Sequence, residues 1–143
     1  MAYSTLDDIE AQISEAKLIQ LTDDDQSAVD ESIVNKAIAD ADSTINSYVA
    51  KAYTVPVVPT PSKLNQLSVT IALYNLFSRR ASNVGGVNEV IRINYEDAIA
   101  FLERVAMGKA TIGVAPAAAP AKSTGGSVSG EKRVFGGNSL RKL

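Results

Sequence analysis

Residues 62–80 are apolar around nearly the whole circumference of the helix that their spacing predicts, and no other feature constrains the fold as strongly. A helix that is apolar all round must be surrounded by other elements or lie at a subunit interface. Three prolines precede it in the stretch 54–61, and we expect Ser62 to cap its first turn. The sequence therefore predicts a central helix, with apolar positions Leu67, Val69, Ile71, Ala72, Leu73, Tyr74, Leu76 and Phe77.

Four further segments have helical spacing and can surround this central helix. Residues 6–13, with Ser4 as the expected N-cap, and residues 14–21 are short. A long helix is predicted from an N-cap at Asp30 or Ser32 to about residue 52. Another covers residues 87–107 and ends before Gly108, which suits a left-handed stop. No segment has convincing strand character, so the fold class is all-α: a small helical bundle of two short and three long helices.

In the predicted helix that ends near residue 52, the polar residues Asp40, Asp42 and Asn46 lie off the apolar stripe. We therefore expect these three side chains on an exposed face. The tyrosines of the chain fall instead within apolar stripes, and we expect Tyr48, Tyr53, Tyr74 and Tyr95 in the core.

The chain changes character after residue 108. Residues 115–130, APAAAPAKSTGGSVSG, are too poor in large apolar residues to build a core. Residues 131–143, EKRVFGGNSLRKL, then regain apolar side chains together with four cations. We therefore divide the chain into a helical body (1–108), a tether (109–130) and an extended C-terminal arm (131–143) that becomes ordered on a partner.

Charge is distributed unequally between these parts. Residues 1–108 carry 8 Lys and Arg against 15 Asp and Glu, a net charge of −7, whereas residues 109–143 carry a net charge of +5. An acidic body with a basic arm indicates that the arm binds an acidic surface. A simpler interpretation, in which the basic tail only aids solubility, stays open.

The composition excludes several classes of protein. The chain contains no Cys and no His, so disulfides, thiolate metal sites and Ser-His or Cys-His catalysis are excluded. The carboxylates form no catalytic constellation, and we expect no enzyme and no cofactor. No apolar run approaches the roughly 20 residues that a membrane span requires, and the acidic N-terminus does not resemble a secretory signal. We expect a soluble protein of intracellular origin without a membrane partner.

The acidic segment 21–31 is the one stretch that resembles a metal-binding loop. Asp23, Asp25 and Ser27 align with the first three ligand positions of an EF-hand. The position of the loop glycine then falls on Ala28 and that of the twelfth-position glutamate on Val34. Because these demanding positions fail, the three residues are weak candidates for calcium binding, and a solvated acidic turn is the favoured interpretation.

Arg79 and Arg80 end the central helix and are candidates for a subunit interface or for the lining of a DNA channel. The acidic body argues against sequence-specific DNA binding, because it repels phosphates. A nucleic-acid-binding protein is nevertheless kept as an alternative, since it predicts salt-sensitive binding of DNA by the isolated chain.

Three stretches together resemble a known family. They are LIQLTDDD (18–25), INSYVAKAYTVPVVPTPSKLNQLSVTIALYNL (45–76) and YEDAIAFLERVAMGKATIG (95–113), and a terminal Phe-x-x-x-Ser-Leu pattern matches Phe135, Ser139 and Leu140. In their order and spacing these segments resemble the Mu-like bacteriophage family of head–tail connector (adaptor) proteins, over essentially the whole chain. The acidic loop is less complete than in many relatives, and the tether is longer and richer in Ala and Pro.

This resemblance implies a virion protein of the neck, at the head–tail interface, which is made in the host cytoplasm. It implies an all-α adaptor that binds the portal protein, forms a symmetric ring with copies of itself, commonly twelve, and joins the DNA-filled head to the tail. A stopper or terminator protein would contact it on the tail side, and DNA would pass through the ring without sequence-specific binding. The alternative is a non-catalytic regulatory module whose basic tail pairs with its own acidic body and inhibits it.

For the adaptor, we expect the arm to dock on the portal or on a neighbouring subunit. Residues 132–135 have β character and can add a strand to the sheet edge of a partner. Phe135 and Leu140 would fill pockets, and the glycines between them would permit a bend. The residues expected at this docking site are Lys132, Arg133, Val134, Phe135, Gly136, Gly137, Ser139, Leu140 and Arg141.

Overall fold

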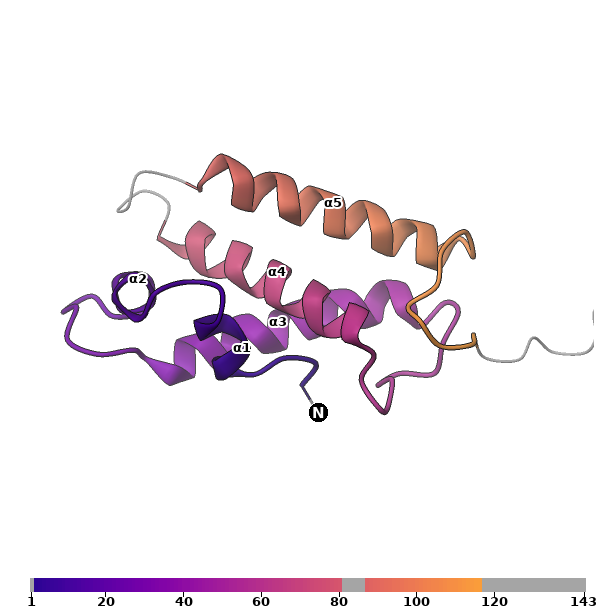
Figure 1. Ribbon diagram of the computed structural model, residues 1–143, viewed down its shortest axis with the longest axis horizontal. Coiled ribbons are helices and arrows are strands. Elements are labelled where there is room, and N and C mark those ends of the chain that lie inside the picture. The colour runs from indigo at the N-terminus through magenta and orange to yellow at the C-terminus, as the bar shows by residue number, and fades with distance from the viewer. Residues whose placement is uncertain (1, 81–86, 117–143) are drawn as a thin grey trace, which may run out of the picture.

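The computed structural model describes residues 2–80 and 87–116, and within these ranges the fold is all-α, as predicted. Two short helices, α1 (Leu6–Glu10) and α2 (Glu15–Thr22), precede three long ones. The long helices are α3 (Glu31–Val49), α4 (Ser62–Arg79) and α5 (Glu89–Ala106). Figure 1 shows that α4 runs back beside α3 and that α5 runs back beside α4.

The central position predicted for residues 62–80 is confirmed. Helix α4 contacts each of the other four helices. Its buried residues point in all directions around the axis, because α3 and α5 cover two sides and the short helices cover part of a third (Figure 1). They are Leu64, Leu67, Ser68, Val69, Ile71, Ala72, Leu73, Leu76 and Phe77. Burial within one chain therefore explains why apolar residues surround nearly the whole circumference of α4.

The helix ends differ in detail from the sequence-based expectations. Helix α1 is capped by Thr5 and not by Ser4, because the Thr5 side chain accepts from the Asp8 N–H while Asp8 accepts from the Thr5 N–H. Ser62 does not cap α4: it is the first helical residue, and Pro61 at the N-cap contributes no side-chain bond. Asp30 caps α3 through the N–H groups of the next turn, as one of the two expected alternatives.

The connection between α3 and α4 is packed against the body. Its X-Pro bonds at Pro56 and Pro59 are cis, and Val57 between them is buried. After α5 the chain turns at Gly108, whose φ of 77° confirms the expected left-handed stop. Packing continues beyond this turn, because Ile112 is fully buried.

Among the expected core tyrosines, Tyr53 is buried and the other three are half-buried. Tyr74 of α4 and Tyr95 of α5 stack with ring centroids 3.9 Å apart and an interplanar angle of 12°. This contact links the two helices. No helix of the described part of the chain is both long and apolar enough to cross a membrane.

Candidate protein-interaction site

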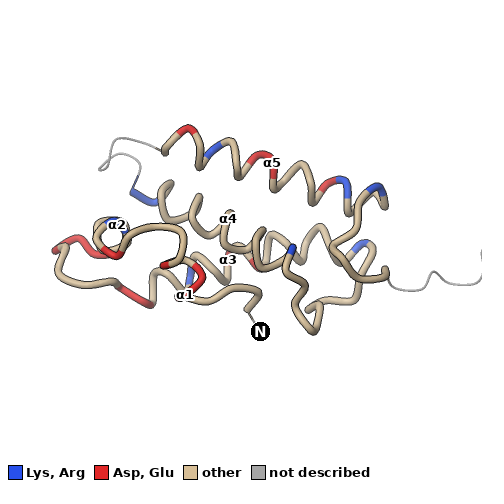
Figure 2. Tube along the Cα trace, viewed as in Figure 1, with Lys and Arg blue, Asp and Glu red and all other residues tan. Residues whose placement is uncertain are grey.

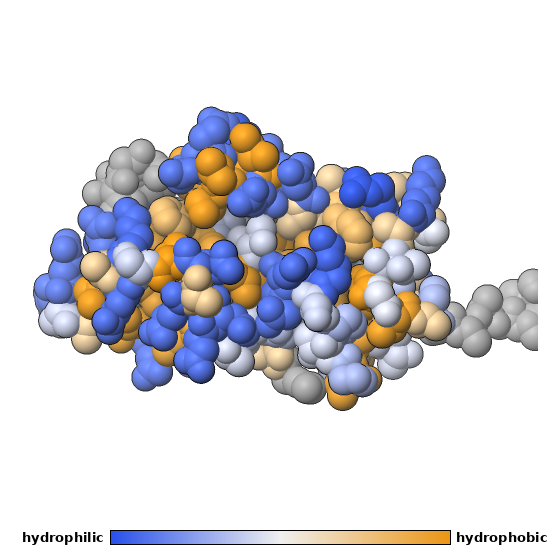
Figure 3. All heavy atoms as spheres, viewed as in Figure 1, coloured by the Kyte–Doolittle hydropathy of each residue, from blue (hydrophilic) through white to orange (hydrophobic). Residues whose placement is uncertain are grey.

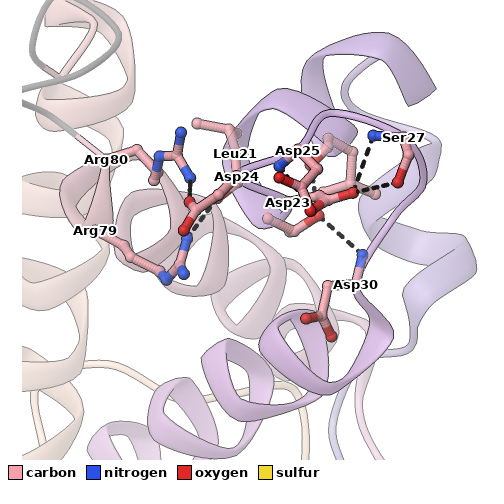
Figure 4. Close-up of polar contacts among 10 residues, drawn as sticks. Leu21, Asp23, Asp24, Asp25, Ser27, Asp30, Arg79 and Arg80 are labelled. Atoms are coloured by element: carbon pink, nitrogen blue, oxygen red, sulfur yellow. Dashed lines mark hydrogen bonds and ion pairs between the residues drawn. The ribbon is translucent and has the colours of Figure 1, made fainter.

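The end of α2 and the loop that follows it are held against the end of α4 by two arginines (Figure 4). Arg79 donates from Nη1 to the carbonyl oxygen of Leu21 at 2.9 Å, and the Arg80 guanidinium pairs with the carboxylate of Asp24. The Arg80 side chain is only 10% exposed, whereas that of Asp24 is 82% exposed. Both predicted interface or channel residues thus make contacts inside the chain, and their role between subunits stays a prediction.

The weak metal candidates Asp23, Asp25 and Ser27 form a hydrogen-bonded turn in the same loop. Asp23 Oδ2 accepts from the N–H and hydroxyl of Ser27 at 2.9 and 2.8 Å and from the Ala28 N–H at 3.2 Å. Asp23 Oδ1 accepts from the Asp25 N–H at 3.0 Å. These donors, first among them the Ser27 N–H, hold the pKa of the Asp23 carboxyl well below its ordinary value.

Both carboxylate oxygens of Asp23 accept hydrogen bonds in this turn, so the lone pairs that a cation would bind are already in use. Within residues 2–80 and 87–116, no group of three or more Asp and Glu side chains is placed to hold a metal ion. The arrangement is that of an Asx-type turn which positions Asp30 to begin α3, since the Asp30 N–H also donates to Thr22 Oγ1 at 3.0 Å.

The expectation that Asp42 lies on an exposed face is wrong. Asp42 is 7% exposed, because the N-terminal residues cross α3 and α4 and cover it. Its Oδ2 accepts from the Tyr3 N–H at 3.0 Å, and its Oδ1 accepts from the Ser68 hydroxyl at 2.7 Å. The hydroxyls of Ser4 and Ser68 also lie 2.7 Å apart. A buried polar network therefore joins the N-terminus to both helices.

Tyr3 extends this network to the proline-rich connection. Its hydroxyl donates to Asn46 Oδ1 at 2.6 Å and accepts from the Val57 N–H at 3.1 Å. Asn65 donates from Nδ2 to the Tyr3 carbonyl at 3.0 Å. Burial raises the pKa of the Tyr3 phenol. Sequence reasoning missed this network, because the helical pattern of residues 30–52 says nothing about what covers it.

A groove of about 540 Å³ lies between α1, α4 and α5. Apolar side chains of α4 and α5 form much of its wall, and the turn after α1 closes one side. Figure 3 shows this face, where hydrophobic residues lie exposed between hydrophilic ones. Its lining includes Leu67, Leu73, Ile91, Phe101, Asp8 and Asp97, together with the cation Lys63.

The chain leaves the body next to this groove. Tyr53 holds the last packed residues, because its hydroxyl donates to the Val114 carbonyl at 3.3 Å and accepts from the Ile112 N–H at 3.4 Å. A second depression, of about 570 Å³, is lined by residues 59–63, residues 111–114 and Phe101. Because Lys63 and Phe101 line both hollows, the two are adjacent.

The predicted docking segment lies outside the described residues. This applies to the tether from residue 117 onward and to the whole arm, residues 131–143, with all the docking positions predicted there. The described body carries acidic residues on α1, on α5 and in the loop between α2 and α3 (Figure 2).

Fold and surface together define a small all-α protein in which buried polar groups join the helices and a groove lies between α1, α4 and α5. This protein is a phage protein: the chain belongs to the family described as Bacteriophage Mu, Gp36, whose model matches residues 3–130. The match spans nearly the whole helical body and the entire tether, residues 109–130.

Two curated relatives agree with this assignment. The Mu-like prophage FluMu protein gp36 of Haemophilus influenzae is 37% identical over 87 residues, which cover 61% of this chain and 57% of that protein. Gene product J of Escherichia phage Mu is 29% identical over 116 residues, covering 80% of this chain and 78% of that protein. The chain thus spans little more than half the length of the first relative.

Proposed function

We propose that this protein is a non-catalytic structural adaptor of the virion neck. It binds the portal protein at the capsid vertex, forms a ring with copies of itself around the DNA channel, and joins the DNA-filled head to the tail. On the tail side it contacts a stopper or terminator protein. Membership of a Mu-like phage family supports a role in the phage, and the resemblance of residues 45–76 and 95–113 to adaptor proteins supports this particular role.

The single observation that carries the proposal is the contrast between the body and the arm. Polar groups of the body, at Asp23, Asp42 and Arg80, are used in contacts within the chain. The arm, beyond a tether poor in large apolar residues, combines Phe135 and Leu140 with four cations. A segment of this composition becomes ordered when it binds a partner surface, and an adaptor meets such surfaces on the portal and on neighbouring subunits.

The tether gives the arm enough reach to cross to another subunit. Sixteen residues, 115–130, span roughly 50 Å when extended at about 3.3 Å each. Ordering the arm costs about 1–2 kcal/mol of backbone entropy per residue, so one arm binds weakly. In a ring, many arms dock on one assembly, and effective concentration offsets the weakness of each contact.

Catalysis is not part of the proposal. The chain has neither His nor Cys, and carboxylates such as Asp40, Asp97 and Glu103 are exposed on helices, where solvation is their ordinary environment. DNA passes the ring without sequence-specific binding, since the acidic body repels phosphates.

The test removes the arm and measures head–tail joining. A chain ending at residue 130 is compared with the full chain in a phage that lacks its own copy, by counting joined particles in electron micrographs. We expect the truncated chain to keep the helical content of the body and to leave heads and tails unjoined. Normal joining by the truncated chain would contradict the proposal.

A finer comparison uses single substitutions of the arm. Phe135→Ser removes an apolar anchor, whereas Ser129→Ala changes a tether residue of no proposed function. We expect the first variant to lower the yield of joined particles and the second to leave it unchanged. Loss of joining in both would point to a general defect of the tail and not to docking by Phe135.

A further inference from the structure

The groove between α1, α4 and α5 has the chemistry of a site for a short basic and apolar segment. Ile91 and Phe101, which are half-buried, offer apolar surface within it, and the buried Leu67 and Leu73 lie beneath them. Asp8 and Asp97 contribute negative charge. Its volume of about 540 Å³ lies within the range of about 300–1,000 Å³ that is typical of ligand pockets. That volume suits one large side chain with its neighbours, and it is too small for thirteen residues.

Lys63 also lines the groove, and its position matters. Its Nζ lies 4.5 Å from the centroid of the Phe101 ring, where the groove meets the second depression. The Lys63 ammonium group thus makes a cation–π contact with Phe101 at one end of the groove. Asp8 comes from α1 and Asp97 from α5, so the acidic side chains belong to the two helices that flank the groove.

One segment of this chain matches the groove in both respects. Residues 132–135 read Lys-Arg-Val-Phe: two adjacent cations followed by two adjacent apolar side chains. Phe135 supplies the large side chain, and the cations before it complement the carboxylates. The other apolar positions of the arm, Leu140 and Leu143, flank cations as well, but neither offers an aromatic ring or two apolar neighbours.

The point at which the chain leaves the body brings this segment within reach. Bonds to Tyr53 fix residues 112–114 beside the second depression, which is adjacent to the groove. From residue 116 to residue 132 the chain has sixteen steps, and a flexible linker of that length has a root-mean-square span of about 20–25 Å. Helix α5, along which the groove lies, has 18 residues and is therefore about 27 Å long.

We propose that, in the free protein, residues 132–135 dock into the groove of their own body, with Phe135 against the apolar wall and Lys132 and Arg133 facing Asp8 and Asp97. The groove then serves as a storage site for the arm. Tethering favours the chain's own segment over that of a second copy, because a short linker produces an effective concentration in the millimolar range.

Docking of this kind has a consequence that rests on the proposed function. Phe135 is also the expected anchor on the portal, so a stored arm cannot bind a portal or a second copy at the same time. Assembly must displace it, and the portal must offer the better site. The adaptor would therefore be protected from pairing through its arms before it meets the head.

The absence of cysteine makes a direct test available, since any introduced thiols are the only ones in the chain. Asn94→Cys places a thiol on an exposed position of the groove, and Gly136→Cys places the second next to Phe135. The matched control pairs Gly136→Cys with Glu103→Cys, which is exposed on the same helix but does not line the groove. Both proteins are oxidised at several dilutions, and non-reducing gels separate monomers with an internal disulfide from dimers.

We expect the groove pair to form the internal disulfide about tenfold faster than the control pair, at a rate that does not depend on protein concentration. Adding Phe135→Ser to the groove pair should reduce the rate to that of the control, whereas adding Leu143→Ser should not. Helical content measured by circular dichroism verifies that each variant is folded.

Two results would overturn the inference. Equal rates for the groove pair and the control pair would show that the arm has no preference for the groove. Disulfide-linked dimers that disappear on dilution would assign the groove to the arm of a second copy. Because these readouts use the free protein, they are independent of head–tail joining, and a failed joining assay would leave them unchanged.

Discussion

Asp42 of α3 accepts a hydrogen bond of 2.7 Å from the Ser68 hydroxyl of α4, and both residues are buried. The same carboxylate accepts from the backbone N–H of Tyr3, so one side chain fixes two helices and the N-terminal segment together. A buried carboxylate with few partners would be costly, whereas here both of its oxygens accept hydrogen bonds.

Replacing Asp42 should therefore be strongly destabilising. Asp42→Ala leaves the Tyr3 N–H without its partner and removes one partner of Ser68, and we expect the free energy of unfolding to fall by about 1–3 kcal/mol. The measurement is urea denaturation followed by circular dichroism. Asp40→Ala is the control, because Asp40 forms an exposed pair with Lys36 and should change the free energy by less than about 1 kcal/mol. Equal effects of the two substitutions would contradict the role given to Asp42.

Acid should destabilise the folded protein in part by protonating the Asp23 carboxylate, which accepts hydrogen bonds in the turn after α2. The Ser27 and Asp25 donors lower the pKa of Asp23 in the folded state, so its contribution is present above the pKa of about 3.9 of an unfolded chain and is lost as the pH falls toward the lower folded value. We expect Asp23→Asn to flatten the fall in unfolding free energy below about pH 4. Asp25→Asn serves as the control, since in the described contacts Asp25 takes part through its backbone N–H. An unchanged acid slope in Asp23→Asn would refute this prediction.

The two ion-paired arginines Arg80 and Arg92 should differ in their importance. Arg80 is largely buried against Asp24, whereas Arg92 pairs with Glu89 and Glu96 on an exposed face of α5. Arg80→Ala removes a largely buried side chain with its packing and its contact to the exposed Asp24, and we expect a loss of about 1–3 kcal/mol. Arg92→Ala should cost less than about 1 kcal/mol. Thermal unfolding of both variants distinguishes them, and similar melting temperatures would show that the α2–α3 loop does not depend on Arg80.

Binding of DNA by the isolated chain should be weak and independent of sequence. With a body of net charge −7, we expect fluorescence anisotropy to detect equal, low affinity for two unrelated duplexes near physiological salt. Tight binding to one duplex, lost as salt is raised, would instead favour a nucleic-acid-binding protein.

The sequence predicted the helices well because each has a local signal. The apolar circumference of α4, the Asp30 cap and the stop at Gly108 all depend on residues that are close in the chain. Thr5 was missed as a cap because Ser4 and Thr5 are both suitable, and the choice depends on Ser4 turning inward to Ser68.

Much less of the candidate site than of the helices could be predicted from the sequence. The groove lies between α1 and α5, which are separated by about 80 residues in the chain. No local sequence pattern predicts that these two helices flank the same part of α4. Burial of Asp42 depends in the same way on where Tyr3 lies. The basic and apolar composition of residues 131–143 did indicate a binding segment, but the surface that it fits follows only from the assembled body.

The most direct test of the adaptor proposal is an electron cryomicroscopy map of the neck of the mature virion. The account predicts a ring of this protein between portal and tail, with residues 131–143 of each copy seated on a neighbouring subunit and Phe135 in a pocket. A neck without this protein, or a ring whose arms contact no other subunit, would contradict it.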